Sequence, residues 1–244
     1  MLTSYKDNMK QDKKYYGDTK LNHFCAFCGC QTETEDHVPS KCFLDKPPPP
    51  HTQDLPVIPC CYKCNHDFSL DEEYVSCMID CMKAGTASPI LIIRREKTRK
   101  FLMHNPKLQD RISAQIRDFG RVLLIEKERF KTVFRKLAFG HLAYENDTLA
   151  WDSPYSIDIH LLSEMSDSQR DDYSRLYRGE LLPEVCSHGL EHAMLSWEDG
   201  HLDSCISPWI PIQEGRYRYC VSPNGNIVKF VIAEFLAVEV NIEI

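Results

Sequence analysis

Four cysteines near the start of the 244-residue chain have the spacing of metal ligands. They form two Cys-x-x-C pairs, Cys25 with Cys28 and Cys61 with Cys64. A tetrahedral zinc ion is typically bound by four thiolates arranged in this way, because each tight turn presents two sulfurs and the ion joins the two turns. The spacing therefore predicts one structural zinc held by these four residues.

An Asp-His pair lies between the two cysteine pairs, where a zinc ion with four sulfur ligands does not need it. Asp36 and His37 are adjacent, and Asn65 directly follows the last cysteine. In an extended segment, neighbouring side chains point to opposite faces, so Asp36 can face a metal ion while His37 faces an attacking water. Imidazole accepts a proton near neutral pH, and carboxylate and amide oxygens suit Mg²⁺ or Mn²⁺. These residues predict phosphodiester hydrolysis, which needs an activated water and a cation.

The order of these motifs resembles the HNH endonuclease family, whose ββα-metal finger is a hairpin, a helix and one catalytic cation. The resemblance covers residues 20 to 84 and rests on three motifs, C-x-x-C at 25–28, D-H-V-P at 36–39 and C-x-x-C-N at 61–65. It implies that His37 is the general base and that Asp36 and Asn65 hold the catalytic Mg²⁺ or Mn²⁺. It also implies DNA as the substrate, cut to leave a 5′-phosphate and a 3′-hydroxyl, with RNA as the alternative.

Two positions leave the pattern open. The middle Asn of the family, which braces the loop of the catalytic His, is replaced here by Asp54, and we expect Asp54 to take the same role. His66 follows Asn65, so the last metal ligand is Asn65, His66 or both. The rest of the chain resembles standalone bacterial HNH proteins linked with anti-phage defence. The competing hypothesis is a catalytically inactive, zinc-stabilised adaptor that binds nucleic acid or protein, and dependence of cleavage on His37 separates the two.

The segments around these motifs predict an α+β protein, with the ββα-metal finger at 21–84 after a flexible lead at 1–20. A short apolar run, 55–59, is typical of a strand that leads into the second cysteine pair. Ser69 and Glu72 have the spacing of a capping box, which predicts a helix from Ser69 to Gly85. Further helices are expected from Asn105-Pro106 to Phe119 and over 123–144, with the basic residues of the last one facing outward.

The end of the chain has the pattern of a small antiparallel sheet. Two β-rich runs, 217–221 and 226–232, flank an Asn-Gly pair, and a third run with alternating apolar residues follows at 235–244. The segment 145–207 is expected to be loops apart from one short helix over 166–177. We therefore divide the chain after the finger into a basic helical region, 85–145, and an acidic α+β region, 146–244.

Charge is distributed unevenly along the chain, although the net charge is −7. Residues 90–140 contain 14 Lys and Arg against 5 Asp and Glu, a balance of +9, and residues 141–208 contain 3 against 14, a balance of −11. A basic segment of this kind is typical of contact with a polyanion. The predicted nucleic-acid contacts are the densest part of it: Arg94, Arg95, Lys97, Arg99 and Lys100. The alternative is a solvated helix face neutralised by the acidic segment.

Composition bounds the remaining expectations. No run of about 18 apolar residues occurs, and the N-terminal residues lack the apolar stretch of a signal peptide, so we expect a cytoplasmic protein without a membrane span. The other eight cysteines are expected to be buried or free thiols. His188 and His192 have helical spacing and form a second candidate zinc site with Cys186 or His201. A homodimer or a partner protein that activates the enzyme is also expected.

Overall fold

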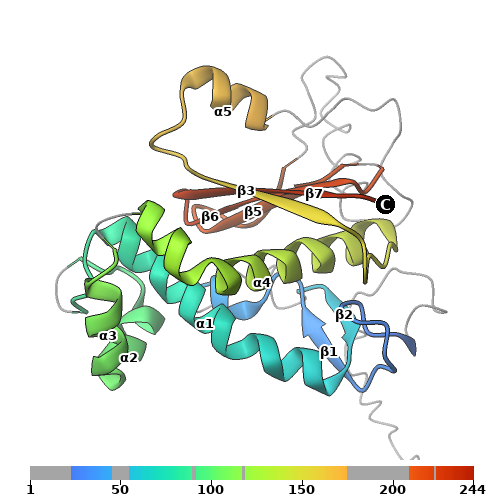
Figure 1. Ribbon diagram of the computed structural model, residues 1–244, viewed down its shortest axis with the longest axis horizontal. Helices are drawn as coiled ribbons and strands as arrows, with labels where there is room; N and C mark the ends of the chain where they lie inside the picture. Colours follow the sequence, from blue (N-terminus) through green and yellow to red (C-terminus); the bar gives the residue numbers. More distant parts are fainter. Residues whose placement is uncertain (1–22, 46–54, 90–91, 117–118, 175–208, 223) are drawn as a thin grey trace, which may run out of the picture.

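The computed structural model describes residues 23–45, 55–89, 92–116, 119–174, 209–222 and 224–244. Its α+β class was predicted. The helix α4 (Phe119–Asn146) lies between a sheet on one side and the helix α1 (Tyr62–Ala84) on the other (Figure 1). No helix in the described part of the chain is both long and apolar enough to cross a membrane.

A two-stranded hairpin precedes α1 in the chain. Strands β1 (Thr34–His37) and β2 (Val57–Cys60) are antiparallel, with Asp36 opposite Ile58 and His37 opposite Val57. The predicted strand before the second cysteine pair is thus confirmed. A 3-10 turn, η2 (Lys41–Phe43), follows β1 and packs on α1. Because β2 runs directly into α1, the hairpin and the helix share the segment that carries the second cysteine pair.

The helix α1 begins earlier than the sequence pattern predicts. Its N-cap is Cys61, whose sulfur accepts a hydrogen bond from the backbone N–H of Cys64 at 3.4 Å. The prediction of a capping box at Ser69 and Glu72 is therefore wrong. The Ser69 hydroxyl donates to the carbonyl of His66, and Glu72 is buried inside the helix. The predicted end is confirmed, because Gly85 adopts the left-handed conformation (φ 65°) of a C-cap.

The basic region contains one more helix than expected. Helix α2 (Glu96–His104) was not predicted, and helix α3 (Pro106–Ser113) begins at the expected proline but ends before Phe119. The helix α4 begins at Phe119 instead of residue 123, and its backbone departs from helical geometry at Glu126 (φ −106°). The side chains expected on its inner face are all buried: Phe130, Val133, Phe134, Leu137 and Ala138.

The C-terminal sheet has five antiparallel strands in the order β3-β7-β6-β5-β4. The predicted hairpin is confirmed as β5 (Tyr217–Val221) and β6 (Ile227–Ile232), and the third predicted run is β7 (Leu236–Ile242). Gly225, in the turn, has φ 73°, and its N–H donates to the carbonyl of Ser222. The strand β4 (Ile210–Gln213) adds an edge next to β5 that was not predicted.

Part of the acidic segment was wrongly predicted to be loop. The strand β3 (Tyr155–Leu161) pairs with β7 along its whole length and forms the other edge of the sheet. Its Ile157 and Ile159 are half-buried and alternate with exposed polar residues, which is the period of a strand with one face on the core. The predicted short helix is α5 (Asp167–Ser174), whose Tyr173 packs on the outer face of the sheet with Trp209.

Aromatic rings form the interface between α4 and the sheet. Phe134 is fully buried, and its ring packs edge to face on two other rings. The ring centroids are 5.5 Å apart for Phe130 and 5.6 Å apart for Phe230 of β6. One hydrophobic cluster continues from these rings through α1 to the first cysteine pair. The position of the hairpin is thus coupled to the packing of α4 on the sheet.

Replacing Phe134 with Ala is expected to lower the free energy of unfolding by about 3–5 kcal/mol, because it opens a cavity where α4 meets the sheet. Denaturant unfolding of the purified protein measures this. The control is Leu70→Ala, since Leu70 is 76% exposed, and it is expected to change stability by no more than about 0.5 kcal/mol. Equal effects of the two substitutions would contradict this account of the core.

Candidate metal centre and the neighbouring Asp-His pair

The four predicted zinc ligands come together at the N-terminal end of α1. The sulfurs of Cys25, Cys28, Cys61 and Cys64 all lie within 4.8 Å of one another. The sulfurs of Cys28 and Cys61 are 3.7 Å apart, and a tetrahedral zinc with Zn–S bonds of about 2.3 Å requires a separation of about 3.8 Å. The cluster can therefore hold one metal ion such as zinc.

Backbone geometry shapes the first cysteine pair. The N–H of Gly29 donates to the carbonyl of Cys25, and the N–H of Cys25 donates to the carbonyl of Cys30. Gly29 has φ 72°, and a Cβ atom there would lie 2.9 Å from the ring of Trp151. The same ring donates its Nε1–H to the carbonyl of Cys25 at 2.9 Å. Trp151, in the connection after α4, thus closes over the turn, and no sequence motif predicted this contact.

The fifth cysteine at this site, Cys60, also contributes. A hydrogen bond with the Cys60 thiol is the main reason why the pKa of Cys25 falls to about 4, against the opposing effect of burial. Burial raises the pKa of Cys28 to about 11. Because zinc binds thiolates, a hydrogen-bond donor next to Cys25 favours the ligand form of that residue.

Asp36 faces the interior, in contact with a buried cation that no sequence pattern indicated. Its Oδ2 lies 2.7 Å from Nζ of Lys136, which is also 2.6 Å from Oε1 of Glu72. Its Oδ1 accepts a hydrogen bond from the backbone N–H of His37 at 2.9 Å. Lys136 comes from α4, where the basic residues were expected to face outward, and that expectation is wrong for this residue. Its side chain is only 4% exposed.

Ser40 completes the contacts of this buried cluster, which has one ammonium group and two carboxyl groups. Ser40 donates its hydroxyl hydrogen to Oε2 of Glu72 at 3.1 Å. Burial acts to lower the pKa of Lys136, but the two carboxylates outweigh it and raise that pKa. Burial raises the pKa of Glu72, and Lys136 opposes this effect. The ammonium group therefore stays charged, and both oxygens of Asp36 already have partners.

His37 and Asn65 belong to the more accessible side of the hairpin. His37 is half-buried whereas its neighbour Asp36 is buried, as expected from the alternation of a strand. Asn65 donates its Nδ2 hydrogens to Oγ1 of Thr34 at 3.2 Å and to the carbonyl of Glu35 at 3.3 Å. The amide of Asn65 thus ties the first turn of α1 to β1.

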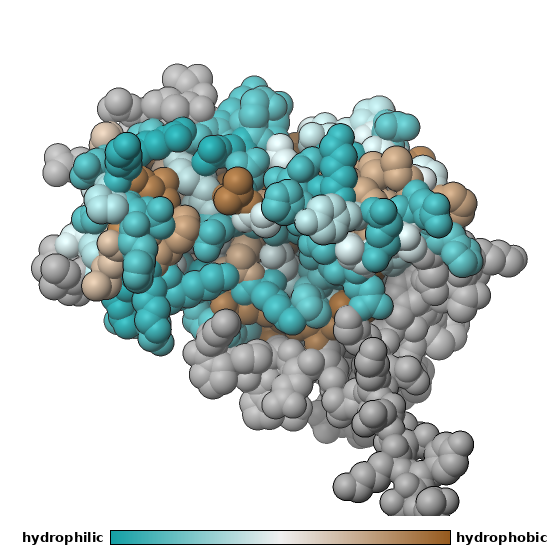
Figure 2. Space-filling model, turned by 90° about the horizontal axis from the view of Figure 1, so that it is seen from below, coloured by the Kyte–Doolittle hydropathy of each residue, from teal (hydrophilic) through white to brown (hydrophobic). Residues whose placement is uncertain are grey.

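His66 is exposed and stacks on the ring of Tyr62, with centroids 5.9 Å apart. Asp54, His188 and His192, and with them Cys186 and His201, lie outside the described residues. Within the described ranges, the four cysteines are the single group of three or more His, Cys, Asp or Glu side chains that could share a metal ion. The face of the molecule seen from below α1 is mostly hydrophilic where it is described (Figure 2).

One predicted nucleic-acid contact is wrong. Arg95 is buried, donates hydrogen bonds to the carbonyls of Cys42 and Leu44, and pairs with Asp80 at 3.2 Å. Asp80 also pairs with Arg216, which lies in the turn between β4 and β5. Arg95 therefore anchors the segment before α2 to α1 and is not available to a polyanion. The sequence pattern did not separate it from its exposed neighbour Arg94.

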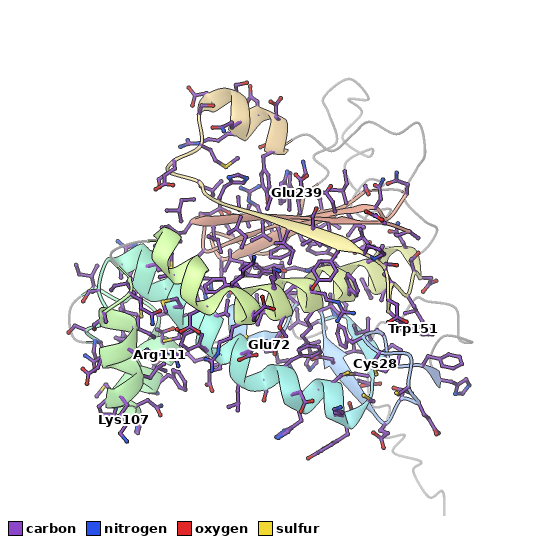
Figure 3. All side chains as sticks on the ribbon, in the orientation of Figure 1. Cys28, Glu72, Lys107, Arg111, Trp151 and Glu239 are labelled. Carbon is purple, nitrogen blue, oxygen red and sulfur yellow. The ribbon has the colours of Figure 1, made fainter. Side chains whose placement is uncertain are left out.

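The other members of the basic block have different surroundings. Arg94 and Lys100 are exposed, and Lys97 and Arg99 are half-buried. Lys100 pairs with Glu96 at 2.6 Å, and Arg99 donates to two backbone carbonyls. Figure 3 shows Lys107 and Arg111 of α3 near the end of α1 that is remote from Cys28 and Trp151. At about 1.5 Å per residue, α1 separates its two ends by roughly 35 Å.

Substituting Cys28 with Ser is expected to abolish stoichiometric zinc binding and to lower the thermal stability of the hairpin and of α1, because structural zinc contributes folding energy directly. Cys30→Ser is a matched control, since both cysteines are exposed and only Cys28 is in the cluster. Zinc per protein by mass spectrometry and thermal unfolding measure the difference. Full zinc content in Cys28→Ser would contradict the ligand assignment.

Replacing Arg95 with Ala is expected to lower the free energy of unfolding by about 3–5 kcal/mol, because it removes one partner from a buried ionic network. Arg94→Ala is the control, since its side chain is exposed, and its expected effect on stability is at most about 0.5 kcal/mol. Denaturant unfolding of both variants gives the comparison. An Arg95 variant as stable as the Arg94 variant would show that the network does not support the fold.

Comparison with known proteins gives no relative from which a function could be transferred. No family model matches the chain, and neither a curated protein nor a solved structure matches it.

Proposed function

We propose that this protein is an endonuclease of the HNH type, which hydrolyses phosphodiester bonds in DNA with His37 as the general base. One observation carries the proposal. His37 lies at the end of β1 and is partly accessible, in a hairpin that the cysteine cluster and Asn65 join to the first turn of α1. This arrangement presents one imidazole on a rigid support, as base catalysis requires.

The proposed division of roles separates the frame from the chemistry. A zinc ion on the four cysteines holds the two turns together and leaves no open coordination position for a substrate. In this proposal His37 accepts a proton from the attacking water, the role that an imidazole most often takes in general base catalysis. As the water oxygen bonds to phosphorus, its proton passes to His37. The bond from phosphorus to the leaving oxygen breaks on the opposite side, and that oxygen takes up a proton from solvent.

The expected Mg²⁺ or Mn²⁺ does not fit the ligand pair that the resemblance implies. Both oxygens of Asp36 are engaged, one by Lys136 and the other by the His37 N–H. Asn65 uses its nitrogen to hold β1, which leaves its amide oxygen, and His66 is exposed beside it. A divalent cation is therefore given no role in the proposed step, and experiment decides whether cleavage requires one.

The proposal extends to the nucleic-acid partner. Arg94, Lys97, Arg99 and Lys100 remain candidates for phosphate contacts, with Arg95 removed. Dimerisation or an activating partner protein, a cytoplasmic location and a role in anti-phage defence stay hypotheses that derive from the resemblance or from composition. RNA stays an alternative substrate.

A specific observation favours a second candidate function. Lys136 neutralises the carboxylate that a catalytic cation was expected to use. A zinc-stabilised adaptor that binds nucleic acid or protein without cleaving it needs no such cation. The two candidates differ in what they expect of His37, because an adaptor retains its function when the imidazole is removed.

The experiment is cleavage of supercoiled plasmid and of single-stranded RNA by the zinc-loaded protein with EDTA, Mg²⁺ or Mn²⁺. Nicking that falls by at least about a hundredfold in His37→Ala is expected, since a general base contributes roughly 10²–10⁴-fold to rate. Comparing the reactions with EDTA, Mg²⁺ and Mn²⁺ shows whether cleavage depends on a divalent ion. His160→Ala is the control, because His160 is exposed on β3, on the far side of α4.

Cleavage that persists in His37→Ala would reject the assigned base. A folded, zinc-loaded protein that binds DNA and cleaves neither substrate would favour the adaptor.

A further inference from the structure

The side chain of Lys136 is buried, with only 4% of its surface exposed. Two carboxylate oxygens, from Asp36 and Glu72, lie 2.7 Å and 2.6 Å from its Nζ. The rings of Phe68 and Phe27 are 5.2 Å and 5.8 Å from it, within the range of cation–π contact. The ammonium group thus occupies a closed space between two acidic groups and two aromatic rings.

This environment resembles a cation site whose ion is part of the protein. Two buried carboxylates without a cation would repel each other and would each pay a large desolvation cost. Oxygen donors of this kind are the usual ligands of Mg²⁺ and Mn²⁺. The ammonium group of Lys136 lies within hydrogen-bonding distance of both carboxylates, in the position that such an ion would take.

We propose that Lys136 is a built-in cation that replaces a divalent ion at Asp36, and that Asp36 is consequently not a metal ligand. Lys136 anchors Asp36 from α4, and Oδ1 of Asp36 accepts the His37 backbone N–H. The ammonium group therefore determines where the His37 peptide lies relative to α4. Lys136 is a positioning residue in this sense. Lys136 takes the place of the ion whether or not the protein cleaves nucleic acid. Only its role in positioning His37 as a catalytic base rests on the proposed function.

Substitution of Lys136 by an uncharged residue is expected to create a metal-binding site. Removing the ammonium with Lys136→Met leaves Asp36 and Glu72 facing a space without a cation, so the variant is expected to acquire a binding site for Mn²⁺ that the wild type lacks. A residue that only fills space would not create such a site. Lys136→Arg retains the charge and should not respond to Mn²⁺.

The experiment is thermal unfolding of zinc-loaded protein with and without millimolar MnCl2, for the wild type, Lys136→Met, Lys136→Arg and the double variant Lys136→Met with Asp36→Asn. We expect Lys136→Met to unfold about 10 °C below the wild type, because two carboxylates lose their partner. Mn²⁺ should restore much of this loss in Lys136→Met, and it should leave the melting temperatures of the other three proteins unchanged.

Two results would overturn the proposal. The first is a Lys136→Met variant that folds but gains no stability from Mn²⁺. The second is Mn²⁺ binding by the wild type that weakens at least tenfold in Asp36→Asn, measured by calorimetry on zinc-loaded protein, since Asp36 would then be a ligand in the presence of Lys136. The calorimetric comparison also decides the case if Lys136→Met does not fold. None of these readouts depends on nuclease activity, so a failure here is distinct from a failure of the His37 assignment.

Discussion

The gathering of four cysteine sulfurs at the start of α1 is the constraint on which the arrangement of the hairpin depends. The connection between β1 and β2 is long, and β1 and β2 have only four residues each. A pair of strands this short is marginal by itself. The sulfur cluster joins the turn before β1 to the N-cap of α1, and Trp151 packs over that turn from the far end of α4. The hairpin is thereby held at the end where Thr34 of β1 pairs with Cys60 of β2.

Buried ion pairs supply the second set of connections. Lys136 links α4 to β1 and α1, and the Asp80 pairs link α1 to Arg95 before α2 and to Arg216 beside the sheet. Such pairs gain little net stability, because desolvation offsets the attraction. However, any other packing that buries one of these charges without its partner has a large free-energy cost. These residues therefore fix how the helices and the sheet are placed relative to one another, with apolar contacts such as those of Phe134 supplying most of the free energy.

The Asp-His pair and the start of the basic block meet neighbouring turns of α1. Lys136 holds Asp36 beside Glu72, in the middle of that helix, and Arg95 donates to Ser76, one turn further along. The cysteine cluster is at the N-terminal end of the same helix. The buried pairs of α1 therefore place the Asp-His pair between the cysteine cluster and the basic block.

The local features of this protein follow from patterns in its amino-acid sequence. The Cys-x-x-C spacing indicated which sulfurs form a cluster, Pro106 marked the start of α3 and Gly85 the end of α1, and the periodicity of α4 and of the last strands indicated their buried faces. These signals are local because each depends on neighbours within a few residues. Tertiary structure alone decided the partners of the charged residues. Lys136 and Arg95 look like solvated basic residues in the sequence, and Asp36 looks like a metal ligand. Their roles depend on side chains up to 100 positions away, since a buried charge is defined by what encloses it.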